Sequence, residues 1–105
     1  MISTWIILVW SALAAQLHQE PMSFLLPFRP IQCSDDYECT KKAEVLQSKA
    51  REDATKLAQE ECTSGIPKMF HANKGEFVSY RVSDISVVGD QLMVTGEISC
   101  MLYSD

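Results

Sequence analysis

Four cysteines are the residues of this chain whose types and spacing carry the clearest chemical signal. Cysteine thiols in a protein commonly pair as disulfides or bind a metal ion. Zinc sites often contain a C-x-x-C pair, but no two of these cysteines have that spacing, and neither histidine stands close to a cysteine. The sequence therefore predicts two disulfides and no metal site. The cysteines are Cys33, Cys39, Cys62 and Cys100.

Four cysteines can pair in three ways, and two considerations favour one pairing. Cys33 and Cys39 have five residues between them, so a bond between them would close a short loop. Cys62 falls on the apolar stripe of an expected helix, and Cys100 falls on the apolar face of an expected strand. Because these two faces should meet, we favour the pairs Cys33–Cys39 and Cys62–Cys100, while the other pairings stay open.

The other reactive residues form no recognisable constellation. The chain has no Gly-rich phosphate loop, no H-x-x-x-H pair, no G-x-S-x-G motif and no C-x-x-C motif. His71 has no acid or nucleophile beside it in the sequence. The acidic cluster that begins at Asp35 is explained by helix capping rather than calcium binding, and Asp84 by hydrogen bonding in a bend. The sequence therefore predicts no catalytic residue, no enzymatic activity and no cofactor.

A long amphipathic helix over residues 35–62 is the element that must position the cysteines. Small and apolar residues recur there at steps of three and four, with charged residues on the opposite side. Asp35 is the expected N-cap, and Glu38 is expected to complete a capping box. Gly65, in a left-handed conformation and followed by Pro67, is expected to end the helix. The apolar stripe consists of Ala43, Leu46, Ala50, Ala54, Leu57, Ala58 and Cys62.

Two runs of alternating apolar residues after residue 76 predict a β-hairpin. The first run changes parity at Ser83-Asp84, which indicates a β-bulge or a bend. Gly89-Asp90, between the runs, is a two-residue turn signal. On the second run Gly96 is expected to let the helix backbone come close, opposite an alanine. The core face of that run carries Leu92, Val94, Gly96, Ile98, Cys100 and Leu102.

These elements predict an α+β fold in which one long helix packs on a C-terminal antiparallel β-hairpin or small sheet, stabilised by disulfides. A helix on two strands alone is a marginal domain. We therefore expect an additional partner for the hairpin. It would be a third strand from the arm around residues 24–28 or from residues 68–72, or a second copy of the chain in a homodimer.

The N-terminal residues have the features of a cleavable signal peptide. Residues 2–15 carry no charged side chain, and Ala12-Leu13-Ala14 predicts cleavage before Ala15. An apolar stretch of about 14 residues falls short of the ~20 that a membrane span needs, so no stable span is expected after cleavage. Export and disulfides together predict a periplasmic or secreted protein. The predicted parts are a signal peptide (1–14), an extended Pro-containing arm (15–32) and a helix-plus-hairpin domain (33–105).

The predicted arm combines three prolines with an apolar cluster. Proline excludes a long helix and a central strand here. The arm is expected either to pack on the domain or to dock on a partner, because exposed apolar patches often mark interaction sites. The candidate partner-binding residues are Phe24, Leu25, Leu26 and Phe28.

Residues 49–62 and 80–100 resemble small exported bacterial proteins of unknown function. In those proteins an alanine-rich helix that ends in a cysteine precedes a hairpin with spaced valines, glycines and a cysteine. The resemblance implies an envelope location and a Cys62–Cys100 bridge, and it implies no activity. The matching hairpin positions are Val87, Gly89, Val94, Gly96 and Cys100.

The charge balance argues against nucleic acid as a partner. The chain has 9 Lys and Arg against 14 Asp and Glu, a net charge of −5, and its basic residues form no patch with interleaved aromatics. The leading hypothesis is a non-enzymatic exported protein-interaction module that binds an unknown envelope or extracellular protein through the arm and the outer face of the hairpin. The alternative hypothesis is a secreted inhibitor or immunity-type protein that blocks an enzyme.

Overall fold

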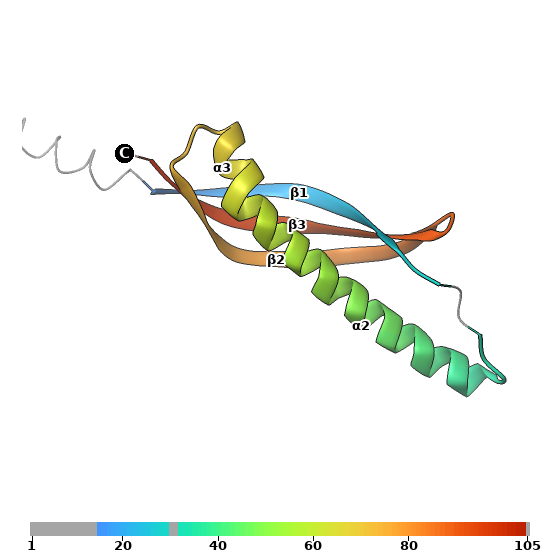
Figure 1. Cartoon of the computed structure of the whole chain (residues 1–105). Coiled ribbons are helices and arrows are strands. Elements are labelled where there is room, and N and C mark those ends of the chain that lie inside the picture. The colour runs from blue at the N-terminus through green and yellow to red at the C-terminus, as the bar shows by residue number, and fades with distance from the viewer. Residues whose placement is uncertain (1–14, 30–31, 105) are drawn as a thin grey trace, which may run out of the picture.

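The structure is a computed structural model that describes residues 15–29 and 32–104, so the predicted signal peptide lies outside the described residues. Disulfides join Cys33 to Cys39 and Cys62 to Cys100, the pairing that the sequence favours. The elements in chain order are β1 (Ala15–Pro27), α2 (Asp36–Glu60), the π-helical turn η1 (Glu61–Gly65), α3 (Ile66–Met69), β2 (Lys74–Val88) and β3 (Gln91–Tyr103) (Figure 1). The chain is an α+β protein, as predicted.

The strands form one antiparallel sheet in the order β1-β3-β2, so β3 is the central strand. It pairs with β1 over its full length, from Ala15 opposite Tyr103 to Pro27 opposite Gln91. The apolar face predicted for β3 is confirmed, because its residues Leu92, Val94, Ile98, Cys100 and Leu102 are all buried in the core.

The predicted order of elements, a helix followed by a sheet, is wrong in one respect, because strand β1 precedes the helix. Most of the segment expected as an arm is this edge strand, which supplies the third strand that a hairpin needs. Pro21 and Pro27 fit an edge position, since half of the N–H groups of an edge strand point away from the sheet and make no ladder bond. The alternative third strand over residues 68–72 does not form.

Helix α2 packs on one face of the sheet through a stripe of small residues. Ala50, Ala54 and Ala58 are buried, and Cys62 and Ile66 continue the stripe at the same spacing of four residues. The Cys62–Cys100 bond fastens this stripe to the central strand. All buried residues of α2 lie in its C-terminal half. Figure 1 shows the helix crossing the sheet at an angle, with its N-terminal end standing away from the strands.

The predicted end of the helix is wrong. Gly65 adopts an ordinary helical conformation, with φ −66°, and the chain continues through η1 into α3. The N–H of Ile66 bonds to the carbonyl of Glu61, five residues earlier, as a π-helical turn requires. This wider turn fits the presence of Pro67, whose ring would clash inside a regular α-helix. The left-handed residue beyond the helical segment is His71, with φ 56°, instead of a glycine.

The glycine beside the helical segment is Gly75, so the role predicted for Gly96 is wrong. A Cβ atom at Gly75 would collide with the main-chain oxygen of Cys62 and would lie 2.8 Å from Cγ of Pro67. A Cβ atom at Gly96 would lie 2.8 Å from Cζ of Tyr80. Gly96 does stand on the core face, but the space it leaves is filled from the neighbouring strand β2 and not from the helix.

Strand β2 contains two β-bulges, one of them at the predicted site. Its register with β3 shifts between Val82 and Asp84, which confirms the bulge expected at Ser83, and again between Phe77 and Ser79. The second bulge leaves Val78 54 % exposed, although simple alternation would place it in the core.

Candidate protein-binding groove

The structure divides the candidate partner-binding residues between the two faces of the sheet. Phe24, Leu26 and Phe28 are partly buried against the core on the helix side. Leu25 points to the opposite face and is 53 % exposed. Because neighbouring residues of a strand point in opposite directions, the four side chains do not form one surface.

Phe24 has a packing role within the domain. Its ring meets the ring of Tyr80 edge to face, with the ring centres 5.6 Å apart. Such an aromatic pair is a common way to fill a core. Of the four candidate partner-binding residues, Leu26 and Phe28 therefore remain, because they lie on the helix side and line an open surface.

That open surface is a groove of about 240 Å³ between the end of β1 and helix α2. Its apolar side chains come from three elements that are far apart in the sequence, and its charged side chains stand on both walls. The groove is lined by Leu26, Pro27, Phe28, Arg29, Leu46, Lys49, Ala50, Asp53 and Leu92.

The groove lies where the helix leaves the core. Ala50 is buried, whereas Leu46, one turn earlier, is only partly buried. Arg29, Lys49 and Asp53 flank the apolar side chains, and within the described residues none of the three takes part in an ion pair. The groove thus combines an apolar interior with charges of both signs at its border, which suits a protein segment more than a small apolar molecule.

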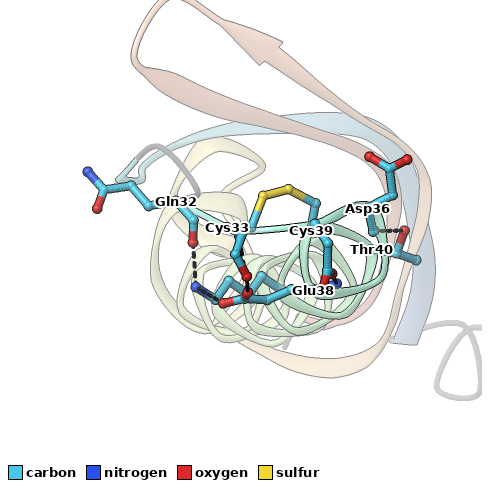
Figure 2. The surroundings of a disulfide bond; sticks show 9 residues. Gln32, Cys33, Asp36, Glu38, Cys39 and Thr40 are labelled. Carbon is cyan, nitrogen blue, oxygen red and sulfur yellow. Dashed lines mark hydrogen bonds and ion pairs between the residues drawn. A yellow bond between two sulfur atoms is a disulfide. The ribbon is translucent and has the colours of Figure 1, made fainter.

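The start of α2, beyond the groove, is held by a dense set of contacts (Figure 2). The Cys33–Cys39 disulfide links the segment before the helix to its first turn. Asp35 is the N-cap, as predicted, because its Oδ1 accepts a hydrogen bond of 2.7 Å from the N–H of Glu38. The predicted capping box is shifted by one residue, since Glu38 Oε2 accepts from the N–H and the hydroxyl of Ser34 instead of from the N–H of Asp35.

The contacts of Glu38 stabilise its charged form. The hydroxyl of Ser34 donates to Oε2 at 2.5 Å, and Nζ of Lys42 lies 2.9 Å from Oε1. These hydrogen bonds, that of the Ser34 hydroxyl first, lower the pKa of Glu38 from 4.5 to about 2. Lys42 also donates to the main-chain oxygen of Gln32, so the segment before the helix is tied to the second turn of α2 as well.

A second cavity, of about 350 Å³, lies at the other end of β1, and sequence reasoning did not find it. There Nε2 of His18 lies 3.3 Å from Oε2 of Glu20, and its ring centre lies 4.4 Å from that of Phe70. No sequence pattern could indicate this cavity, because β1 and the end of the helical segment meet only through the fold. It is lined by Gln16, Leu17, His18, Phe70, Ala72, Leu102 and Ser104.

Over residues 15–29 and 32–104, no group of three or more His, Cys, Asp or Glu side chains is placed to hold a metal ion. In the same part of the chain, none of the helices combines the length and the apolar character that a membrane crossing requires.

Comparison with known proteins does not add a family. The chain matches no protein-family model, no curated protein and no solved structure.

Proposed function

We propose that this protein is a small exported, non-enzymatic domain that binds another protein of the cell envelope or the extracellular space. The observation that supports this proposal is the groove between β1 and α2. Its apolar interior is contributed by Leu26, Phe28, Leu46 and Leu92, and its charged border by Arg29, Lys49 and Asp53. Leucine and phenylalanine surfaces left open to water favour contact with another apolar surface.

The groove best fits an apolar side chain of a partner with charged residues on either side of it. The apolar side chain would cover Leu26 and Leu46, whose burial would supply most of the binding free energy. Lys49 and Asp53 stand one turn apart on the helix and would select a partner segment with an acidic and a basic residue at matching positions.

The two disulfides support the proposed location. Disulfides persist in oxidising compartments such as the periplasm and the extracellular space. Both pairs join cysteines within this chain and no described cysteine is left free.

An inhibitor that blocks a target enzyme is the second candidate function. It is favoured by the pairing of β1 with the central strand, since a rigid inhibitor keeps its binding segment ordered without its target. This candidate uses the same groove and differs only in the class of the partner.

Photo-crosslinking tests the proposal. A photoreactive phenylalanine analogue is placed at Lys49, on the border of the groove, and in a control variant at Glu60, which is exposed at the other end of α2. Each variant is exported from a native-type host and irradiated. We expect the variant with the analogue at position 49 to form a covalent adduct with one protein, and the variant with the analogue at position 60 to form none. Leu46→Asp in the same background should remove the adduct. Equal labelling from both positions, or no adduct from position 49, would contradict the proposal.

The identity of the adduct then separates the two candidates. An enzyme whose activity falls on addition of the purified protein would support the inhibitor. A partner without such an effect would support the interaction module.

A further inference from the structure

The outer edge of strand β2 is the second open surface of this sheet. Within the described residues, β2 pairs with β3 alone, so the main-chain groups of its other edge have no strand beside them. An edge strand of this kind is a template for pairing with another strand. Strand β1, at the opposite edge, is less suited, because Pro21 and Pro27 interrupt its row of N–H donors.

The charged residues of β2 alternate in sign along one face of the sheet. Lys74, Glu76, Arg81 and Asp84 pair in register with Tyr103, Met101, Glu97 and Thr95 of β3, which all stand on the face away from the helix. Ser79, opposite Ser99, belongs to the same face and lies in the middle of this row. The row therefore reads positive, negative, serine, positive, negative.

This order is complementary to itself when the strand is reversed. The bulge residues Val78 and Ser83 are left out of the count. Glu76 and Arg81 then lie two positions from Ser79, in opposite directions along the strand. On the same count, Lys74 and Asp84 each lie four positions away. A second copy of β2, antiparallel and centred on Ser79, would thus set Glu76 opposite Arg81 and Lys74 opposite Asp84.

We propose that two copies of this chain associate through the outer edges of their β2 strands, antiparallel about Ser79, into one six-stranded sheet. A two-fold axis through Ser79 makes the contact isologous, so each of the two charge pairs occurs twice. The main-chain hydrogen bonds of the new strand pair supply the attraction, and the charge pairs select the register.

The neighbouring registers are disfavoured by the same residues. A shift by two positions in one direction would set Glu76 opposite Asp84, and in the other direction Lys74 opposite Arg81. Both bring like charges face to face, which destabilises a strand pair. A shift by a single position would set outward side chains against inward ones. The bulge at Ser83 is essential to this match, because without it the two pairs could not form in one register.

The side chains involved are available for such a contact. Lys74 and Glu76 are both placed by Tyr103 of β3: Nζ of Lys74 lies 4.9 Å from the ring centre, and the hydroxyl of Tyr103 donates to Glu76 Oε2 at 3.1 Å. A carboxylate has two oxygens, so Glu76 keeps one for an arginine. Within the described residues Arg81 and Asp84 take part in no ion pair, and all four charged side chains are exposed.

A charge-swap experiment tests the dimer on the disulfide-bonded protein. Sedimentation velocity across the micromolar range should show a reversible monomer–dimer equilibrium for the wild type. Glu76→Lys and Arg81→Glu should each raise the dimer dissociation constant about tenfold or more, because each variant sets like charges opposite twice in its own dimer. Glu60→Lys, with the same charge change on the helix, should leave the dissociation constant unchanged.

Mixing the two variants separates a contact between copies from a defect within one copy. In a mixed dimer, Lys at position 76 faces Glu at position 81, and the native pair forms at the other side of the axis. An equimolar mixture should therefore dimerise about as tightly as the wild type. A wild type that stays monomeric throughout, or a mixture no tighter than its components, would overturn the proposal. Leu46→Asp changes the groove and not strand β2, so it should leave the dimer dissociation constant unchanged. The dimer proposal and the groove proposal can therefore fail independently of each other.

Discussion

The hydroxyl of Tyr80 donates a hydrogen bond of 2.7 Å to the main-chain oxygen of Met22, and this bond joins the two edge strands across the central strand. Tyr80 belongs to β2 and Met22 to β1. The ring can cross β3 because Gly96, which stands opposite Met22, has no side chain. A single tyrosine thus links all three strands on the side of the sheet that the helix covers.

The first prediction concerns this hydrogen bond. Tyr80→Phe keeps the ring and removes the donor, so we expect the free energy of unfolding to fall by about 0.5–1.5 kcal/mol.

Burial raises the pKa of Tyr80 above its ordinary value of 10.0. The unfolded chain therefore ionises first, and the stability due to the neutral tyrosine is complete below pH 10 and declines at higher pH. Urea unfolding at neutral and alkaline pH should show a smaller alkaline loss for the variant. An equal loss in both proteins would contradict this role of Tyr80.

The second prediction compares two glycines that differ in their surroundings. Gly96→Ala should destabilise the fold by about 1–3 kcal/mol, because the added Cβ would lie 2.8 Å from Cζ of Tyr80 and would meet the main-chain oxygen of Arg81. Gly65→Ala should stabilise it by about 0.4–1 kcal/mol, since Gly65 is helical and the nearest atoms belong to the flexible side chain of Glu61. Thermal unfolding of both variants checks the two signs, and a shift in the same direction would count against the packing described here.

The third prediction ranks the two disulfides. Cys62–Cys100 closes a loop with a sequence separation of 38, whereas Cys33–Cys39 has a separation of 6. The chain-entropy model predicts that removing the disulfide of the longer loop lowers the free energy of unfolding by about 4 kcal/mol. Removing the disulfide of the shorter loop lowers it by about 2 kcal/mol. The double variant Cys62→Ala/Cys100→Ala should therefore be much less stable in denaturant than Cys33→Ala/Cys39→Ala. The opposite ranking would show that Cys62–Cys100 contributes less to the free energy of unfolding than Cys33–Cys39 at the start of the helix.

The fourth prediction concerns the acid response of the helix start. Hydrogen bonds from Ser34 and Lys42 lower the pKa of Glu38 to about 2. Because the folded pKa is lower than the unfolded value of 4.5, this stabilisation is complete above pH 4.5 and is lost as the pH falls toward 2. Carbon NMR titration of the Glu38 carboxyl should show the low midpoint. Ser34→Ala should move that midpoint up, and an unchanged midpoint in this variant would contradict the role of the Ser34 hydroxyl.

Local sequence patterns were enough to predict the start and the buried stripe of the helix and the buried face of the last strand. Helical spacing of small residues predicted the stripe with Ala50, Ala54 and Ala58, and Asp35 predicted the N-cap. Alternation in the last strand placed Cys100 on the buried face. These features depend on residues a few positions apart, and the physics of capping and periodicity acts at that range. The same local patterns predicted the bulge at Ser83.

Contacts between distant segments became known only from the folded structure. Strand β1 reaches the sheet only by pairing with β3, which is at the other end of the chain, and the two prolines of β1 obscure the sequence pattern of a strand. The space beside Gly96 is filled from β2, and the groove brings Leu26, Leu46 and Leu92 together from three elements. No local pattern encodes such contacts, because they depend on the relative placement of whole elements, which packing of the complete chain fixes.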